Sequence, residues 1–317
     1  MIRKQITEQK LTLCAEFQNA RPFRHICIDN FLDQDAAESL LRDFPKFNPS
    51  KAMNEFGKAG RKAVHTDLAQ ISTFYKSFYQ YLSSESFLTL VSEITGIPDL
   101  LFDPEMFGGG THENLHGQGL YPHVDFNYDL DCERHRRLNL LLYLNKEWHD
   151  EWGGVIELHS NPRKPEDDRV IGFSPIFNRA VIFETNEYSW HGFRQIQLPA
   201  DKQHLSRKCV SLYLYTKARP ADEIVPPHGT FYVMDPLPAH IQPGRTLSAA
   251  DVDQIQNALK SRDVWIEYYQ KLEMRDNGTI QSLKAALERN AFLQFGARVL
   301  PAPVKEKLKK LFASRSH

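Results

Sequence analysis

One stretch constrains the fold of this chain more than any other, the run of residues 138–144. It reads Leu-Asn-Leu-Leu-Leu-Tyr-Leu and is apolar at nearly every position. A strand with one face in water alternates apolar and polar residues, so a nearly continuous apolar run predicts a strand that is covered on both faces. The residues before Gly96 show apolar spacings of three and four, which are typical of helices. We expect these helices to cover one face of the strand.

Period-two patterning extends over the middle of the chain, from Leu100 onwards. Many short strands separated by glycine, proline and asparagine are typical of a sandwich or a jelly roll. The predicted strands are residues 100–107, 119–126, 137–144, 155–158, 180–184, 190–196 and 210–217.

Helical patterns dominate both ends of the chain. Before the strands, helices are predicted within residues 2–17, 70–82 and 84–94. A further helix is predicted to begin after Asp33, which is a candidate N-cap, and a strand is predicted at 23–28. After them, the proline-rich residues 219–244 predict an irregular connector. Ser248-Ala-Ala-Asp resembles a capping box that opens a helix, and further helical patterns lie at 264–272, 280–291 and 304–312. We therefore divide the chain into a helical and strand support region (1–98), a β core (99–218) and a connector with a helical extension (219–317).

Composition excludes several classes of protein. The chain has 317 residues, of which 41% are hydrophobic and 25% charged, as in an ordinary globular protein. A net charge of −1 gives no sign of a nucleic-acid partner. The four cysteines form no C-x-x-C pair, which argues against a disulfide scaffold. The N-terminus does not resemble a signal peptide, and no apolar run reaches the ~20 residues of a membrane span. We expect a cytoplasmic protein without a transmembrane segment.

Two histidines and an aspartate stand out as candidate metal ligands. His123 and Asp125 lie two apart within a predicted strand, so their side chains leave the same face. His191, in a later predicted strand, supplies a third ligand from a distance. Two imidazoles and one carboxylate on one face of a metal form the facial triad that suits Fe(II). The spacing of His123 and Asp125 alone is common by chance, and the motifs that follow strengthen the prediction.

Four motifs appear in order around these residues: the run that begins at Arg137, then Trp152-Gly-Gly, then Asn178-Arg-Ala-Val-Ile-Phe-Glu, and the strand that begins at Arg207. Together they resemble the iron- and 2-oxoglutarate-dependent dioxygenases of the prolyl 4-hydroxylase-like family, over roughly residues 107–217. The resemblance implies a mainly β fold, a double-stranded β-helix (jelly roll) core with N-terminal bracing helices and a C-terminal helical extension. It also implies Fe(II), O2 and 2-oxoglutarate as cofactors, with ascorbate as a reductant, and a hydroxylase that releases succinate and CO2.

The same resemblance suggests which residues bind 2-oxoglutarate. Arg207 matches the family's anchor for the far carboxylate, and arginine suits that role because its planar fork pairs with both oxygens. Ser211 shares a face with Arg207, Tyr143 matches a tyrosine of the family, and Asn139 lies on the same face as Tyr143. The segment between His191 and Arg207 is longer than the family norm. It leaves open whether Arg207 or the adjacent Lys208, which faces the other side, is the anchor.

Three functions remain open at the level of sequence. The first is hydroxylation of an unactivated C–H bond, with a small molecule or glycan slightly favoured over a peptidyl proline as the substrate. The second is a non-catalytic member of the fold that binds a ligand or partner. The third is a zinc hydrolase, because His112-Glu-Asn-Leu-His116 matches the H-E-x-x-H motif. That motif needs a helix, and the glycines on both flanks disfavour one. We expect a loop and strand there, with His116 or Gln118 bordering the pocket.

The C-terminal residues 301–317 form a basic amphipathic pattern. Val304, Leu308, Leu311 and Phe312 have helical spacing, and lysines surround them. Such a helix either packs its apolar side on the body of the protein, which we favour, or contacts a membrane or a partner. The sequence leaves the oligomeric state open.

Overall fold

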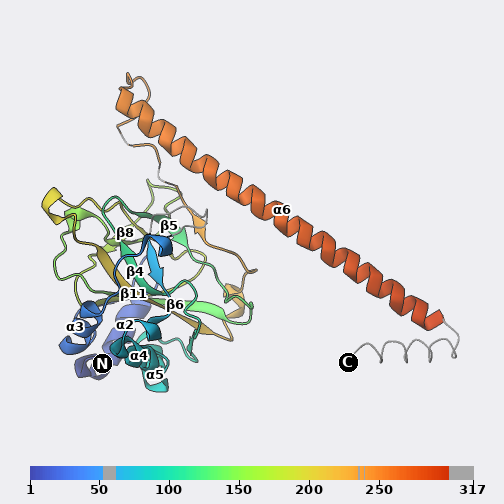
Figure 1. Ribbon diagram of the computed structural model, residues 1–317, viewed down its shortest axis with the longest axis horizontal. Coiled ribbons are helices and arrows are strands. Elements are labelled where there is room, and N and C mark those ends of the chain that lie inside the picture. The colour runs from blue at the N-terminus through green and yellow to red at the C-terminus, as the bar shows by residue number, and fades with distance from the viewer. Residues whose placement is uncertain (53–61, 235, 239, 300–317) are drawn as a thin grey trace. The chain divides into compact units, whose positions relative to one another are not determined.

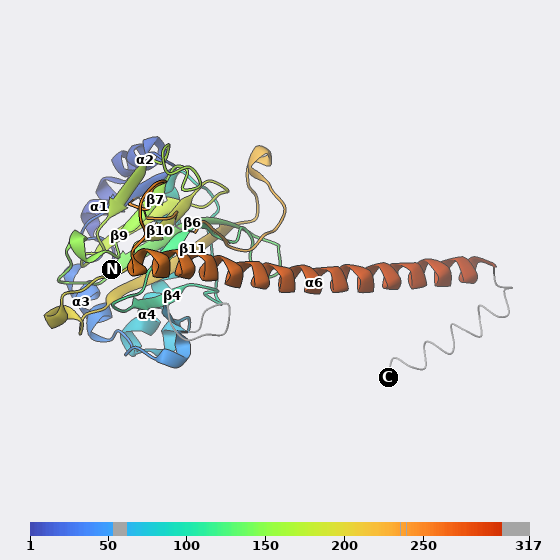
Figure 2. The same cartoon turned by 90° about the horizontal axis from the view of Figure 1, so that it is seen from above.

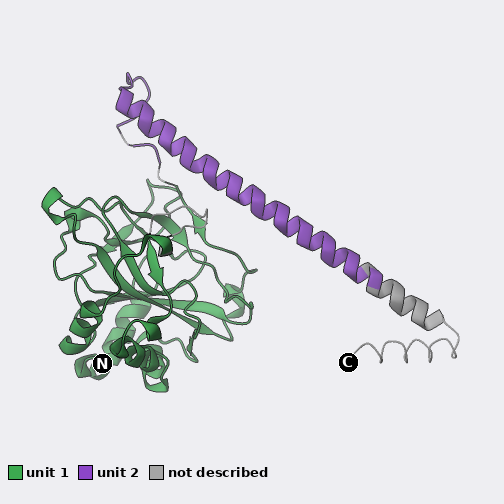
Figure 3. Ribbon diagram, viewed as in Figure 1, with its two compact units in different colours: residues 1–235 green, residues 236–317 purple. Residues whose placement is uncertain are grey.

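The computed structural model describes residues 1–52, 62–234, 236–238 and 240–299 (Figure 1). The chain forms two compact units, residues 1–235 and 236–317 (Figure 3). The division at residues 98 and 218, which follows changes in sequence character, stays a prediction.

Two antiparallel sheets build the first unit. The larger has the order β1-β9-β6-β11-β4-β2, with β3 also paired to β11, and the smaller has the order β12-β5-β10-β7-β8. Apolar residues of both sheets, among them Tyr143, Leu158 and Phe183, form one buried cluster between them. The predicted jelly-roll fold is thereby confirmed. The strands are β1 (His25–Ile28), β2 (Ala63–His65), β3 (Leu101–Phe102), β4 (Gly110–Asn114), β5 (Leu120–Val124), β6 (His135–Tyr143), β7 (Ile156–His159), β8 (Val170–Phe173), β9 (Arg179–Glu184), β10 (Trp190–Phe193), β11 (Arg207–Thr216) and β12 (Phe231–Tyr232).

The N-terminal helices cover the outer face of the larger sheet. Leu138, Leu140 and Leu142 of β6 pack in one buried cluster with Phe87 and Val91 of α5. The intervening β6 residues face the smaller sheet, so the strand is covered on both sides as predicted. The helices are α1 (Lys4–Glu8), α2 (Lys10–Asn19), α3 (Gln34–Arg42), α4 (Thr73–Leu82) and α5 (Glu85–Thr95), with short 3-10 turns at Pro49–Lys51, Leu68–Gln70, Asp150–Trp152, Ala200–Lys202 and Ala221–Glu223.

Local sequence signals set the ends of α5. The Ser84 hydroxyl accepts the Phe87 backbone N–H, which satisfies one of the free donors of the first turn. Gly96 ends the helix with φ of 68°, a left-handed conformation that glycine adopts without strain. Both signals agree with the predicted helix at 84–94.

The second unit contains one long helix, α6 (Ala249–Val299), which Figure 2 shows as a continuous run. Ser248 and Asp251 form the predicted capping box, since each side chain accepts the backbone N–H of the other. The separate helices predicted at 264–272 and 280–291 are joined, because no proline interrupts the segment and Gly278 alone does not end it. The helix predicted at 304–312 lies outside the described residues. Within the described part of the chain, no helix combines the length and apolar character that crossing a bilayer requires.

Candidate active site

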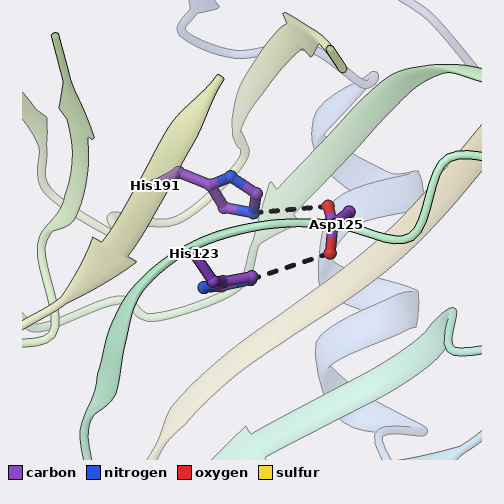
Figure 4. Close-up of side chains that lie close together, drawn as sticks. All are labelled: His123, Asp125 and His191. Atoms are coloured by element: carbon purple, nitrogen blue, oxygen red, sulfur yellow. Dashed lines mark ion pairs between the residues drawn. The ribbon is translucent and has the colours of Figure 1, made fainter. Parts of the chain in front are cut away.

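Two neighbouring strands of the smaller sheet bring the three candidate metal ligands together. His123 of β5 and His191 of β10 are directly paired in the antiparallel ladder, so their side chains lie on the same face. Asp125, just beyond the end of β5, turns its carboxylate toward both rings (Figure 4). Its two oxygens lie 3.7 Å from Nε2 of His123 and 3.4 Å from Nε2 of His191. Among the described residues this is the only cluster of three such groups close enough to hold one metal ion.

Hydrogen bonds on the far side of each ring fix the tautomers. Nδ1 of His123 lies 2.9 Å from the Tyr121 carbonyl, and Nδ1 of His191 lies 2.9 Å from the Ser189 carbonyl. A carbonyl oxygen only accepts, so each Nδ1 carries the hydrogen and each Nε2 presents a lone pair toward Asp125. Metal-binding histidines are held in this way. The donor set therefore fits a divalent metal ion.

The charges around the cluster also favour the metal-binding protonation states. Burial, and then the neighbouring His191, lower the pKa of His123 to about 3. Burial likewise lowers the pKa of His191. Burial alone would raise the pKa of Asp125, but the Arg136 guanidinium and the two imidazoles hold that pKa well below its usual range. Two neutral imidazoles and one carboxylate are therefore ready at neutral pH.

Asp125 is held in place by two further side chains. Nη2 of Arg136 lies 2.9 Å from Oδ2 of Asp125, and the Asn139 amide donates to the same oxygen at 2.8 Å. Arg136 in turn donates to Oδ1 of Asn139, so the three groups form a closed network. Arg136 is fully buried, with its guanidinium 4.3 Å from the centre of the Phe126 ring and 3.6 Å from that of Tyr213. The network fixes the carboxylate and balances its charge.

Arg136 was missed by the sequence analysis for a geometric reason. Strict alternation along β6 would place Arg137, not Arg136, on the face of Asn139. The pairing of β6 with β11 shifts register here, since Leu138 faces Leu214 while Arg136 faces Tyr215. This bulge turns Arg136 toward the cluster. The sequence shows two adjacent arginines, Arg136 and Arg137, and does not reveal which of them points toward the metal-ligand cluster.

A second polar site lies around Arg207 at the start of β11. Its guanidinium is buried. Nε donates to the Gly154 carbonyl at 2.7 Å, and Nη2 donates to the Tyr143 hydroxyl at 2.9 Å. It also lies 4.2 Å from the centre of the Phe193 ring, two residues beyond His191 on β10. Arg207 therefore lies between the two sheets, close to the strand that supplies a candidate metal ligand.

The Trp152-Gly-Gly motif makes room for this arginine. Gly154 has φ of 70°, and a side chain there would meet Trp148 at 3.0 Å and the Arg207 side chain at 3.2 Å. Glycine therefore permits the close approach of the backbone to the guanidinium. Burial raises the pKa of the Tyr143 phenol, which stays protonated and keeps an O–H to donate after accepting from Arg207.

Of the other predicted cosubstrate residues, Ser211 and Asn139 lie farther along the same interior. The Ser211 hydroxyl is buried and has no hydrogen-bond partner among the described residues. An unpaired buried hydroxyl fits a bound polar molecule. Asn139 uses both ends of its amide on Asp125 and Arg136, so the structure places it beside the metal-ligand cluster. Asn114, absent from the sequence analysis, is paired with Arg207 across the ladder and shares its face.

Lys208, the alternative anchor, faces the other side of the strand. Its ammonium pairs with Glu113 at 3.1 Å and hydrogen-bonds to Ser206. Because the Lys208 ammonium is paired with these partners on the other face of β11, it does not reach the space between the two sheets. Of the two candidate anchors, Arg207 is the one whose charge lies between the two sheets.

The H-E-x-x-H segment is a strand and a turn. His112 and Glu113 belong to β4, where successive side chains point to opposite faces. Nε2 of His112 bonds to the Gly108 carbonyl, and Nδ1 of His116 accepts the Leu198 backbone N–H. The helix that would bring both histidines and Glu113 to one side is absent, and His116 lies beyond the end of β4, so the geometry that a zinc hydrolase needs is missing.

Part of the connector after β11 packs beside His123, a contact that the sequence did not predict. We use "strap" for residues 226–233, which include β12. The Asn127 side chain bonds to the Pro226 carbonyl and to the His228 backbone N–H. Tyr232 pairs with His123 across the ladder, and the two rings stack with their centres 5.2 Å apart. A two-residue strand inside a proline-rich segment leaves no periodic signal, so only the structure reveals it.

Asn139→Ala is expected to raise the Kd for Fe(II), or for Co(II) as a probe, by about 10- to 100-fold, because such carboxylate-orienting partners have effects of that size. The KM for 2-oxoglutarate should change little. Metal titration followed by absorbance, with Leu141→Ala from the same strand face as a packing control, checks this. A raised KM for 2-oxoglutarate with an unchanged Kd for the metal would instead show that Asn139 binds the cosubstrate, as the sequence predicted.

The part of the chain that contains the site also matches a family model. Residues 110–215 match the sequence model of the 2OG-Fe(II) oxygenase superfamily. This part of the chain contains the candidate metal ligands and Arg207. The match confirms the predicted resemblance over these residues, to a superfamily named for Fe(II) and 2-oxoglutarate.

Several individual proteins are similar to this chain. It is 25% identical over 211 residues to the prolyl 3-hydroxylase OGFOD1 of Mus musculus, and the match covers 65% of this chain but only 35% of that relative. Among solved structures, it is similar to a Trichoplax adhaerens prolyl hydroxylase in complex with a hypoxia inducible factor peptide fragment, with 17% identity, 68% of this chain and 94% of that chain covered, and a TM-score of 0.47. It is also similar to HygX from Streptomyces hygroscopicus with nickel and 2-oxoglutarate bound, with 12% identity, coverage of 68% and 88%, and a TM-score of 0.42.

Proposed function

We propose that this protein is a dioxygenase that uses Fe(II) and 2-oxoglutarate to hydroxylate an unactivated C–H bond. The observation that supports it best is the presence of two complementary polar sites between the same two sheets. His123, Asp125 and His191 offer a facial donor set, and Arg207 places a buried cation near the same strand. A metal-binding protein without turnover has no need for both.

Each residue has a defined part in this proposal. His123, Asp125 and His191 hold the metal, and Arg136 with Asn139 keeps the Asp125 carboxylate ionised and oriented. Arg207 binds the far carboxylate of 2-oxoglutarate, while the Tyr143 O–H and the unpaired Ser211 hydroxyl donate to the same cosubstrate. When bound, the iron and 2-oxoglutarate together supply the electrons that activate O2, with release of succinate and CO2. Ascorbate is proposed as the reductant that keeps the iron reduced.

Aromatic side chains at the metal-ligand cluster support a substrate with a ring. Phe126 follows Asp125 directly and packs against Phe107, which is 43% exposed, and against Tyr213. A prolyl ring and a sugar ring both pack well on such a surface. The named relative is a prolyl 3-hydroxylase, which favours a peptidyl proline. We therefore propose a peptidyl prolyl residue as the first substrate to test, with glycans and small molecules alongside.

Succinate formation tests the proposal even while the substrate is unidentified. The purified chain receives Fe(II) anaerobically, then 2-oxoglutarate and O2, and succinate is measured with and without candidate substrates. Iron-dependent succinate, stimulated by one substrate class, is the expected result. Binding of iron and 2-oxoglutarate with no succinate under any condition would support the alternative, a non-catalytic binding protein. Failure to bind either would contradict both.

A further inference from the structure

The helix α6 carries a row of exposed apolar side chains at a regular spacing. Val252, Leu259, Ile266, Ile280 and Leu287 are seven residues apart, with one gap at 273, and their exposed fractions run from 39% to 71%. A second row lies three residues further on. We call the two rows together the α6 stripe: Val252, Ile255, Leu259, Ile266, Tyr269, Ile280, Leu283 and Leu287. Alternating spacings of three and four are the signature of a helix that pairs with another helix in a coiled coil.

The middle of α6 is intrinsically weak, which means that it needs support. Asn277 and Gly278 lie inside the helix, and a glycine there costs about 1 kcal/mol relative to alanine. Long helices in water depend mainly on packing of an apolar face rather than on propensity. A partner on the α6 stripe would provide packing on the C-terminal side of the weak segment, since Ile280 and Leu283 lie two and five residues after Gly278.

Charged residues that interrupt the stripe select the partner and its direction. Arg262, Glu273 and Asp276 occupy positions that continue the two rows. In a parallel, in-register pair, each would face its own copy, and like charges opposite one another are unfavourable. In an antiparallel pair with Ile266 opposite Tyr269, Arg262 faces Glu273 of the other helix. The same alignment sets Ile255 opposite Ile280 and Val252 opposite Leu283. Leu259 meets Asp276, a mismatch that the two-fold symmetry repeats, and Leu287 faces Ser248, just before the start of the helix.

We propose that α6 binds α6 of a second copy of this chain as an antiparallel two-stranded coiled coil, centred between Ile266 and Tyr269. The stripe, which is exposed except at the half-buried Ile255, supplies the contact, and the Arg262–Glu273 pair fixes the alignment. The proposal is independent of the oxygenase chemistry, because all of its residues lie in the second unit.

The oligomeric state of the full chain tests the contact. Sedimentation equilibrium over a wide concentration range is expected to show a dimer, and Ile266→Lys is expected to raise its Kd by more than tenfold. Met274→Lys is the matched control, since Met274 is 73% exposed on the same helix but lies off the stripe. Circular dichroism shows whether α6 stays helical. A monomer at all concentrations, or an equal effect of both variants, would overturn the proposal.

A charge exchange tests the direction. Arg262→Glu and Glu273→Arg are each expected to weaken the dimer, and the double variant is expected to restore it. As a second measurement, a chain with Ile255→Cys mixed with a chain with Ile280→Cys should form a mixed disulfide under oxidation, with the unaltered chain as the control for Cys132, which is exposed. Self-crosslinking of Ile255→Cys without charge rescue would show a parallel pair and overturn the proposed alignment.

Discussion

Replacing His123 with alanine is expected to abolish iron-dependent succinate formation and to remove tight binding of Fe(II) or Co(II). His123 supplies one of three ligands, and its Nε2 lone pair faces Asp125 because Nδ1 is occupied by the Tyr121 carbonyl. Two remaining ligands from one face leave the metal with too few protein donors for the facial site. Metal titration and the succinate assay, run on the same preparation, measure the two losses separately.

The matched control is His204→Ala, which removes an exposed histidine from the loop between β10 and β11. It should leave both metal binding and turnover unchanged. Asp125→Ala should match His123→Ala, with the added consequence that the buried Arg136 loses its carboxylate partner. Retention of metal-dependent turnover in His123→Ala would disprove the assignment of the metal site.

Arg207→Ala is expected to raise the KM for 2-oxoglutarate by roughly 30- to 1000-fold, with a smaller effect on metal binding. Truncating one partner of a buried charged pair typically costs about 2–4 kcal/mol, which corresponds to that range. The guanidinium is already oriented by the Gly154 carbonyl and the Tyr143 hydroxyl, so a ligand carboxylate would meet a preorganised cation. Steady-state kinetics with varied 2-oxoglutarate measure the change.

The neighbouring residue provides a sharp control for this experiment. Lys208→Ala removes an adjacent positive charge that pairs with Glu113 on the other face, so it should leave the KM for 2-oxoglutarate nearly unchanged. Arg207→Lys should give an intermediate KM, since lysine keeps the charge but loses the planar fork. The opposite ranking, with Lys208→Ala the more damaging, would assign the anchor to Lys208.

The sequence predicted the main elements of the fold for identifiable reasons. The two-sided apolar run of β6 required a cover on each face, and the helices with three–four spacing provide one of them. The strands β2, β8 and β12 escaped prediction because they are short and lack alternating apolar residues, and β4 was expected only as part of a loop and strand without defined bounds. The residues of β4, Gly110–Asn114, are mostly polar, and they are buried because neighbouring segments cover them. Such burial depends on tertiary structure, so the pattern of apolar residues in the sequence does not reveal it.

The site divides in a similar way. The spacing of His123 and Asp125 predicted a shared direction, and the structure brings them to His191 through direct pairing of β5 with β10. Arg136 and Tyr232 could not be predicted, since one depends on a bulge and the other on a pairing between distant segments. Asn139 was assigned to the correct face, but its hydrogen bonds place it next to Asp125.

The strap has a consequence for how much of the chain must be kept together. The family match ends at residue 215, yet β12 pairs with β5, the strand that carries His123. A fragment cut after the matched region would leave the outer edge of β5 with unpaired backbone groups, and exposed edges of this kind invite aggregation. It would also lose the aromatic partner of His123. The smallest fragment expected to remain soluble with an intact metal-ligand cluster therefore extends through Val233, whose backbone N–H bonds to the Pro122 carbonyl.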